Sequence, residues 1–422
     1  MRSTKCLQQI AIAGSCLLAL SLPAAALEEP SVPPDDAPSS VTVPFVLDHN
    51  RMLLDAEFLR SDGTWRPVRL WVDTGNPACL ISADLARDLG IDLSAMTDSA
   101  GQAAGALFVE PPKGVRIGEM PLDYAGVQTM VLAQPHWLFT SMRIDANLPA
   151  SVLKRFRVVF DYPGRALTLG RPGTFEPRGE RSPAAVNLET GIVQLDAVIA
   201  GDTLSFALDN GASYCFTSAG ILEGWSRAHP EWPRMNGALG CANIWGWWPD
   251  EPVWPVVRLP EIAWGSAHLE GVGVVGLPNF FGNDASVGQW YSRKTARPVD
   301  GFLGPNAFGA FRVEIDYENS AVYFHRTGEF GVQDMDLVGL TLRPEEDGGY
   351  SVIGVAVQDG RPAVEGVMAG DRLLTIDGLQ ATGATMGTVI DALRGKPGDI
   401  RRLEIERAGK RITVSAKVAR FL

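Results

Sequence analysis

Two blocks of sequence occur twice in this chain, in the same order, and this internal repeat constrains the fold more than any other feature. Residues 69–82 (RLWVDTGNPACLIS) align with 205–218 (SFALDNGASYCFTS), and share Asp, Gly, Cys and the final Ser at an offset of 136. Residues 156–169 (FRVVFDYPGRALTL) align with 311–324 (FRVEIDYENSAVYF) at an offset of 155. Chance similarity can explain one such block but is a poor explanation for two in register. The sequence therefore predicts two equivalent lobes.

The composition allows several packed cores. The chain has 422 residues, of which 46% are hydrophobic and 20% are charged, values ordinary for globular protein, and this length suggests roughly two to four domains. From about residue 43, short alternating segments predict β-strands, and Ser82 stands where the N-cap of a short helix is expected. We therefore expect a mainly β fold with short helices.

The charge of the chain bears on its partners. The net charge is −12 and the isoelectric point is near 5.0, so nucleic acid and anionic membrane surfaces would both repel it. We therefore expect no nucleic-acid partner.

Residues 1–26 have the features of a signal peptide. A positively charged start is followed by an apolar run at 10–22 and by a small-residue cleavage site that ends at Ala26. A retained N-terminal anchor and a lipoprotein modified at Cys16 are the alternatives. Residues 27–42, rich in Pro, Ser and acidic side chains, are predicted to be a linker. We expect a periplasmic or secreted protein that has no transmembrane anchor after cleavage.

Three cysteines follow the signal peptide, at positions 79, 215 and 241. At most one intramolecular disulfide can form, so the fold does not depend on a disulfide framework. Cys79 and Cys215 each lie six residues after the Asp of their repeat, with no His nearby to act as a base, which favours packing over nucleophilic chemistry. The five histidines show no zinc spacing with cysteine, and we predict no metal and no cofactor.

The repeated aspartates are the candidate catalytic groups, Asp73 and Asp209. Two carboxylates a few ångströms apart cannot both ionise easily, so one keeps a proton. The charged group can take a proton from water while the neutral one hydrogen-bonds a carbonyl oxygen. Each Asp follows a hydrophobic segment and has a Gly two residues later, which permits a tight turn. A single Asp-x-Gly is common turn chemistry, but two copies in matched contexts are stronger evidence.

The residues that follow each Asp are predicted to support the turns. The hydroxyl of the first turn can hydrogen-bond across to the other lobe, and an Asn at the matching position of the second turn has both a donor and an acceptor. We hypothesise that Asn76 hydrogen-bonds Asp73 and favours its charged form, so that Asp209 holds the proton. The predicted support residues are Thr74, Gly75, Asn76, Asn210, Gly211 and Ala212.

Over residues 43–328 the chain resembles the retropepsin-like aspartic peptidases. The segment Gly301-Phe302-Leu303-Gly304 before the second copy of the second repeated block is close to the family pattern, whereas Ala146-Asn147-Leu148-Pro149 before the first copy lacks both glycines. A second departure is Asn210, which stands where the family has the hydroxyl of Thr or Ser. The resemblance implies two retropepsin-like β-barrel lobes, at 43–176 and 184–328, that form a pseudo-dimer in one chain. It also implies an aspartic endopeptidase that acts on polypeptides.

Each lobe is expected to carry a loop over the cleft. In the first lobe, residues 97–115 contain Gly101 and Gly105 in a stretch that suits a mobile loop. In the second lobe, residues 237–254 are rich in tryptophan. These side chains either line a substrate cleft or pack an enlarged loop, since buried area alone is enough to justify Trp; they are Trp245, Trp247, Trp248 and Trp254.

Residues 332–420 form a separate module that resembles a PDZ domain. Its segment 370–378 (GDRLLTIDG) matches the family's Gly-Asp-x-Ile-x-x-Ile-Asp-Gly pattern, and a helix is expected over residues 386–394. Such domains add a peptide as an extra strand and bind its terminal carboxylate. The resemblance places a peptide C-terminus on Ser351, Val352, Ile353, Gly354 and Val355. The alternative is a module that only packs against the lobes.

Two classes of function remain open from the sequence. In the first, an exported aspartic endopeptidase uses Asp73 and Asp209, and the C-terminal module assists substrate recognition. In the second, a catalytically degenerate pseudo-peptidase binds peptides without cutting them. Asn210 and the missing glycines of the first lobe favour the second class, whereas both intact Asp-x-Gly turns favour the first.

Overall fold

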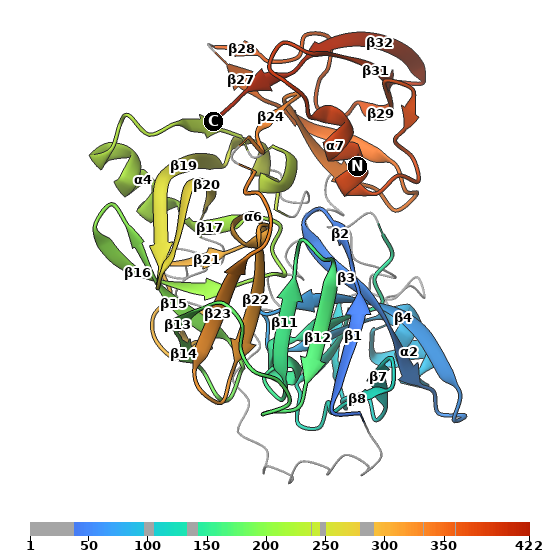
Figure 1. Ribbon diagram of the computed structural model, residues 1–422. Coiled ribbons are helices and arrows are strands. Elements are labelled where there is room, and N and C mark those ends of the chain that lie inside the picture. Colours follow the sequence, from blue (N-terminus) through green and yellow to red (C-terminus); the bar gives the residue numbers. More distant parts are fainter. Residues whose placement is uncertain are drawn as a thin grey trace.

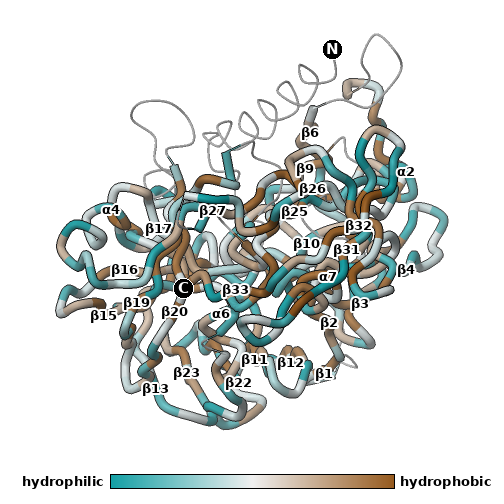
Figure 2. The backbone as a smooth tube through the Cα atoms, turned by 90° about the horizontal axis from the view of Figure 1, so that it is seen from above, coloured by the Kyte–Doolittle hydropathy of each residue, from teal (hydrophilic) through white to brown (hydrophobic). Residues whose placement is uncertain are grey.

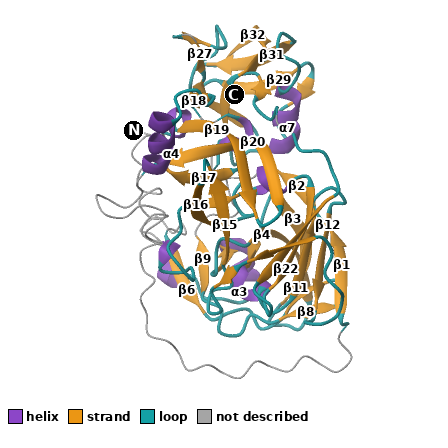
Figure 3. Ribbon diagram, turned by 60° about the vertical axis from the view of Figure 1, so that its left-hand side comes forward, coloured by secondary structure: helices purple, strands orange, loops and turns teal. Residues whose placement is uncertain are grey.

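The computed structural model describes residues 38–96, 105–132, 142–237, 239–244, 250–278, 291–331, 333–358 and 360–422. The fold is mainly β, as expected, with short helices between the strands (Figure 3). Two β-rich lobes lie side by side and a smaller sheet lies above them (Figure 1). The predicted signal peptide and most of the predicted linker lie outside the described residues, and no helix within those residues is long and apolar enough to cross a membrane.

One sheet joins the two lobes. The repeated hairpins pair with each other, with Val158 opposite Ile315 and Phe160 opposite Val313 in antiparallel register. The two copies of the second repeat block therefore form one layer that spans both lobes. Its described strands, in order, are β1 (Ser40–Pro44), β12 (Ala166–Gly170), β11 (Arg157–Asp161), β22 (Phe311–Asp316), β23 (Ala321–Arg326) and β13 (Glu180–Pro183).

The first lobe adds a second sheet that ends at Asp73. In this sheet β10 runs parallel to β4, which places Pro149 opposite Asp73. Two short helices follow its strands, α2 (Ala83–Asp88) and α3 (Ala150–Leu153). Its described strands are β2 (Val46–Asp48), β3 (Arg51–Leu59), β4 (Trp65–Asp73), β5 (Cys79–Ser82), β6 (Ala106–Val109), β7 (Val115–Ile117), β8 (Met120–Leu122), β9 (Thr129–Leu132) and β10 (Ala146–Pro149).

The second lobe repeats this arrangement. Here β21 runs parallel to β16, with Leu303 opposite Leu208, and Asp209 follows directly. The helices are α4 (Ala219–Ala228) and α6 (Pro305–Phe308), and the turns of 3-10 helix η2 (Gly240–Ala242) and η3 (Glu251–Val253) precede β19. The described strands are β14 (Ala185–Val186), β15 (Val193–Ile199), β16 (Asp202–Leu208), β17 (Cys215–Ser218), β18 (Arg234–Asn236), β19 (Pro255–Trp264), β20 (Ala267–Leu277) and β21 (Gly301–Leu303).

The repeat extends to individual hydrogen bonds. Ser82 caps α2 and Ser218 caps α4, each accepting a bond from the backbone three residues later, which confirms the predicted cap at Ser82. A second matched pair was missed from the sequence. Asp145 Oδ2 accepts from the Arg69 N–H at 3.1 Å, and Asp300 Oδ2 accepts from the Ser205 N–H at 2.8 Å. These shared caps and bonds show that the two lobes are built on one plan.

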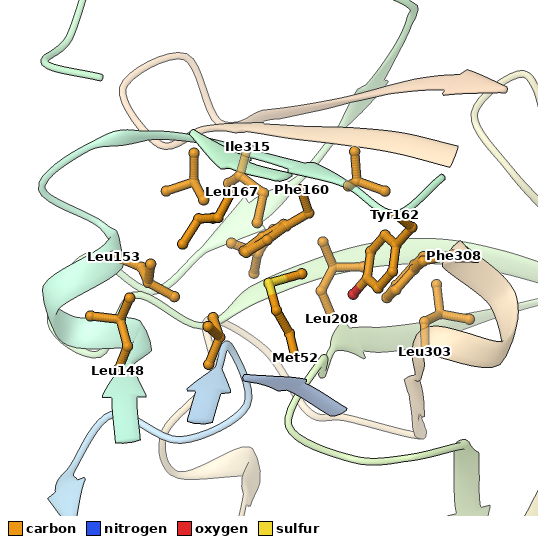
Figure 4. Packing of buried hydrophobic residues seen from close by; sticks show 14 of the residues in the cluster. Met52, Leu148, Leu153, Phe160, Tyr162, Leu167, Leu208, Leu303, Phe308 and Ile315 are labelled. Atoms are coloured by element: carbon orange, nitrogen blue, oxygen red, sulfur yellow. The ribbon is translucent and has the colours of Figure 1, made fainter. Parts of the chain in front are cut away.

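Both lobes share one hydrophobic core beneath the joining sheet. Leu148 of the first lobe and Leu208 and Leu303 of the second point into the same cluster as Phe160 and Ile315 of that sheet (Figure 4). Hydrophobic residues lie along inner strands of the sheets, for example along β20 (Figure 2). Because the strands that end at the two aspartates rest on one core, their positions relative to each other are set by common packing.

The C-terminal module has its own sheet. The expected helix is α7 (Met386–Leu393), and Ala408 and Gly409 form the turn between the last two long strands, with positive φ of 49° and 77°. Its membership of the PDZ family stays a prediction. The described strands of the main sheet are β25 (Leu340–Pro344), β26 (Tyr350–Val355), β29 (Arg372–Ile376), β31 (Ile400–Arg407) and β32 (Lys410–Lys417), with β30 (Leu379–Gln380) beside β29. Flanking pairs are β24 (Asp336–Leu337) with β33 (Ala419–Arg420), and β27 (Val357–Gln358) with β28 (Arg361–Pro362).

A buried ionic cluster joins the repeated hairpins across the lobes. Glu314 is fully buried and accepts from Arg157 Nε at 2.7 Å and from Arg312 Nη1 at 2.9 Å. Arg157 also lies 3.2 Å from Asp316 Oδ2. Charges taken out of water in this way are stable only while they are paired.

We predict that Glu314→Ala lowers the free energy of unfolding by about 3 kcal/mol, because it leaves buried Arg157 and partly buried Arg312 without the carboxylate that they share. Chemical denaturation measures this loss. The matched control is Asp55→Ala, which removes the exposed carboxylate of the Arg69–Asp55 pair and should cost less than about 1 kcal/mol. Equal losses in the two variants would contradict a structural role for the buried cluster.

Candidate active site

The two predicted aspartates are brought together at the boundary between the lobes. Asp73 ends β4 and Asp209 follows β16, and their exposed fractions are only 3% and 6%. A methyl group placed on Gly75 would lie 2.5 Å from Asp209 Cγ, and one placed on Gly211 would lie 2.4 Å from Asp73 Oδ1. Each carboxylate therefore lies against the backbone of the opposite turn, in space that only glycine leaves open.

Hydrogen bonds across the lobes fix this opposition. The Thr74 N–H donates to Asn210 Oδ1 at 2.9 Å, and the Asn210 N–H donates to Thr74 Oγ1 at 3.0 Å. The Thr74 hydroxyl in turn donates to the Leu208 carbonyl at 2.9 Å. The Asn side chain thus accepts a bond from the other lobe, at the position where the resemblance led us to expect a hydroxyl.

Each carboxylate accepts hydrogen bonds from the backbone of its own turn. Asp73 Oδ1 accepts from the Gly75 N–H at 3.1 Å, whereas Asp209 Oδ1 accepts from the N–H groups of Gly211 at 2.9 Å and Ala212 at 3.0 Å. The Asn76 side chain accepts from the Ala78 N–H at 3.0 Å. The hypothesis that the Asn76 side chain hydrogen-bonds Asp73 is therefore wrong. This side chain instead hydrogen-bonds the backbone of its own loop.

Burial raises the pKa of both acids, and the charge of Asp209 raises that of Asp73 further. For Asp73, burial and then the charge of Asp209 place the pKa well above its usual range. For Asp209, burial raises the pKa to about 6, opposed by the N–H groups of Ala212 and Gly211. The pair titrates as a unit, and backbone N–H groups lower the pKa of each acid: Gly75 and Asn76 for Asp73, Ala212 and Gly211 for Asp209. The hypothesis that Asp209 holds the proton stays a prediction.

The first lobe compensates for its missing glycines. Fully buried Asn147 accepts from the Leu80 N–H at 2.7 Å and donates to the Ala78 carbonyl at 3.0 Å. In the second lobe the corresponding Phe302 stacks on Phe216 with ring centroids 4.3 Å apart. Asn147 thus joins two strands of the first lobe by hydrogen bonds, and Phe302 holds the equivalent strands of the second lobe by aromatic stacking. The first lobe keeps its arrangement of strands without the glycines.

Three residues near the acids were missed from the sequence. Burial raises the pKa of Tyr291, and the charges of Asp209 and Asp73 raise it further. Burial chiefly raises the pKa of Tyr162, to which the charge of Asp209 also contributes. Arg51 Nε donates to the Gly211 carbonyl at 2.8 Å. Tyr162 belongs to the repeated Asp-Tyr motif and had a sequence signal there, whereas Tyr291 and Arg51 had none.

The expected cleft loops are only partly described. Trp254 is buried and packs into the core shared by the second lobe and the C-terminal module, which agrees with the packing interpretation at that position. Gly105 adopts a left-handed conformation with φ of 83°. The remaining expected loop residues lie outside the described part of the chain: Gly101, Trp245, Trp247 and Trp248.

The predicted peptide strand of the C-terminal module is an inner strand in its first half. Ser351 pairs with Arg343 of β25 on one side and with Arg372 of β29 on the other, and the Val352 N–H donates to the Asp371 carbonyl at 2.8 Å. Pairing on both sides therefore involves Ser351, and the binding of a peptide strand along Ser351–Val355 stays a prediction. The end strand of this sheet is β25.

The cysteines are buried thiols. Cys79, Cys215 and Cys241 are all free and buried, and burial raises the pKa of Cys79 and of Cys215 to about 12. A thiol at such a pKa is a poor nucleophile near neutral pH. Within the described residues, no group of three or more His, Cys, Asp or Glu side chains could hold a metal ion.

Comparison with known proteins gives structural similarity only. No protein-family model matches the sequence, and no curated protein matches it either. Among solved structures, the aspartic proteinase from Irpex lacteus is similar, with a TM-score of 0.38 and 12% identity. That match covers 69% of this chain and 98% of the other. At this level of similarity, the chemistry of the site has to be inferred from its own residues.

We predict that Gly75→Ala destabilises the protein by about 1–3 kcal/mol, because its methyl group would overlap Asp209 and force the lobes apart. Chemical denaturation measures the loss. The control is Gly224→Ala in α4, where no neighbouring atom lies within 4 Å, and where alanine should leave stability unchanged or raise it by up to about 1 kcal/mol. A Gly75→Ala protein as stable as this control would contradict the close opposition of the turns.

We predict that Asp209→Asn becomes more stable relative to the wild type as pH rises from 4 to 7. The pKa of Asp209 is about 6 in the folded protein against an ordinary 3.8, so between these values the folded state binds more protons and loses stability as pH rises. Asparagine removes this loss, which amounts to at most about 3 kcal/mol. Thermal unfolding at several pH values measures the difference, and a pH-independent difference would contradict the raised pKa.

Proposed function

We propose that this chain is an aspartic endopeptidase that cleaves polypeptides with Asp73 and Asp209. The observation that carries the proposal is the contact of each carboxylate with the glycine of the opposite turn, which places two buried acids face to face. Burial raises the pKa of both groups, as a shared proton requires. The surrounding geometry suits activation of a water molecule without a metal or a nucleophilic side chain.

The reaction follows from the two protonation states. The ionised acid of the pair takes a proton from a water molecule between Asp73 and Asp209, and the water oxygen forms a bond to the carbonyl carbon of the peptide. The protonated acid donates a hydrogen bond to the carbonyl oxygen and then its proton, which gives a neutral tetrahedral intermediate. The acid that took the water proton returns it to the amide nitrogen as the carbon–nitrogen bond breaks, and the other acid regains the hydroxyl proton as the carbonyl reforms.

The proposal includes export, with the mature chain beginning after Ala26 and acting in the periplasm or outside the cell. It also gives the C-terminal module a supporting role. Its end strand β25 is contacted by Asn243 of the second lobe, whose Nδ2 donates to the Leu342 carbonyl. This contact favours a module that packs against the lobes over one that recruits a peptide C-terminus along that strand.

The second candidate is a pseudo-peptidase that binds peptides without hydrolysis. The observation in its favour is Asn210, which stands where a hydroxyl is expected from the family resemblance. The bond from the Thr74 N–H to Asn210 Oδ1 weighs against it, because the cross-lobe connection that a hydroxyl would make is present in another form.

Cleavage of a peptide library by the mature protein, from acidic to neutral pH, tests the function. We predict cleavage with a maximum on the acidic side of neutrality, and its loss by at least about a hundredfold in both Asp73→Asn and Asp209→Asn, because removal of an acid–base group costs about 10²–10⁴-fold. The matched control is Asp196→Asn, an exposed acid of β15, which should cleave like the wild type.

Two results would contradict the endopeptidase. Folded protein that binds peptides at every pH without cutting them would establish the pseudo-peptidase instead. Cleavage that survives either substitution would place the chemistry elsewhere in the chain.

A further inference from the structure

The tip of the hairpin β2–β3 reaches from the first lobe to the catalytic turn of the second. His49 and Asn50 form this tip with positive φ of 52° and 61°, a conformation that suits a two-residue hairpin turn. Asn50 Nδ2 donates to the Ser213 carbonyl at 3.0 Å, and Arg51 Nε donates to the Gly211 carbonyl at 2.8 Å. Two side chains of one tip therefore hold the backbone immediately after Asp209.

Arg51 is a fully buried cation with several partners. Besides Gly211, it contacts His49 Nδ1 at 3.3 Å and donates through Nη2 to the Ile244 carbonyl. Burial lowers its pKa to about 10, so the guanidinium still carries its charge at neutral pH. A planar guanidinium with several donors suits a site in which it must join two separate backbone segments.

The charge of Arg51 acts on the catalytic pair. It lowers the pKa of Asp73 and of Asp209, opposing the effect of their burial. The charged and titratable groups around Arg51 and the pair come from both lobes. They are Asp48 and His49 of the hairpin, Cys241 and Glu251 of the second lobe, and Tyr162 and Tyr291 beside the acids.

The second segment that Arg51 holds is packed under the C-terminal module. Residues 239–244 pass between α7 and the strand β25: the Cα of Gly240 faces Ile390 and Leu337, to which an added methyl group would lie 3.6 and 3.7 Å away. Asn243 contacts Leu342 as described above, and Ser213 Oγ donates to the Cys241 carbonyl at 2.6 Å. The module, this segment and the catalytic turn are therefore linked by consecutive contacts.

The module also holds the hairpin itself. The Gly387 N–H in the first turn of α7 donates to Asp48 Oδ1 at 3.2 Å, and Asp48 is fully buried. The His49 ring contacts the Gly240 carbonyl at 3.2 Å. Both sides of the Arg51 site, the hairpin and the segment 239–244, are thus packed against the same helix.

We propose that Arg51 is a positioning residue for the catalytic pair, which fixes the turn after Asp209 and supplies the positive charge that keeps the pair active at lower pH. The C-terminal module completes this site by holding the two segments that Arg51 joins. This inference rests on the proposed aspartic peptidase function, and it assigns the module to the support of the active site.

Three substitutions separate charge from anchoring. Arg51→Met removes both, and should lower kcat by at least about tenfold while moving both limbs of the pH–rate profile to higher pH, because the acids lose a neighbouring cation. Arg51→Lys keeps the charge but loses the fork of donors, so its limbs should move less while kcat still falls. Asn243→Ala loosens the segment without removing a charge, and should lower kcat with the limbs unchanged.

A readout without activity keeps the test independent of the proposed function. In mature protein labelled with ¹³C at the aspartate carboxyls, the resonances of Asp73 and Asp209 should titrate at higher pH in Arg51→Met than in the wild type. Assignment uses the Asp73→Asn and Asp209→Asn proteins. If the Arg51→Met protein does not fold, Arg51→Lys is measured instead. Because lysine keeps the positive charge, the resonances of Asp73 and Asp209 should then titrate close to those of the wild type.

Some outcomes would overturn the inference. Folded Arg51→Met with wild-type titration shows that Arg51 does not act on the pair, whether or not the protein cleaves peptides. If the limbs of the pH–rate profile move equally in Arg51→Met and Asn243→Ala, the change in pH dependence comes from loosening of the segment and not from the charge of Arg51. Absence of cleavage in the wild type, with titrations shifted as expected, rejects the peptidase while supporting the electrostatic role of Arg51.

Discussion

The rest of the structure depends on the contact between each carboxylate and the glycine of the opposite turn. Because an added methyl group at Gly75 or Gly211 would lie about 2.5 Å from the acid it faces, the two turns are as close as backbone packing permits. Both acids are also buried away from bulk solvent, which makes their charges interact strongly. The shared core beneath both strands and the sheet that joins the lobes can be understood as the means of holding two like charges together.

Such a site needs compensation, and the compensation comes from outside the two turns. N–H groups of the turns stabilise a negative charge on Asp209, and the buried guanidinium of Arg51 opposes the repulsion between the acids. Burying a third charge is itself costly unless it is paired and hydrogen-bonded, and Arg51 meets this condition through carbonyls of two segments. The small C-terminal module covers those segments and so contributes to the electrostatics of a site that it does not touch.

The sequence was sufficient for the parts that repeat. Two matched Asp-x-Gly turns predicted the lobes and the two acids, and Ser82 and α7 followed from local capping and periodicity. It was insufficient where contacts join distant segments. Arg51 lies at a hairpin tip with no motif around it, and the direction of the Asn76 side chain is decided by its own loop. The strand order of the C-terminal module likewise depends on pairing that no local pattern encodes, such as that of Ser351 with both β25 and β29.

The joining sheet has a consequence for how the two lobes can change. Since β11 and β22 belong to one chain, the halves of the site need not be identical, and a substitution in one half leaves the other as it was. Asn147 and Phe302 solve the same packing problem in different ways, and Thr74 and Asn210 make unlike halves of one hydrogen-bonded link. A site formed by two copies of a single shorter chain would have to accept each such change twice. Broken symmetry lets the surroundings of each acid change independently of those of the other.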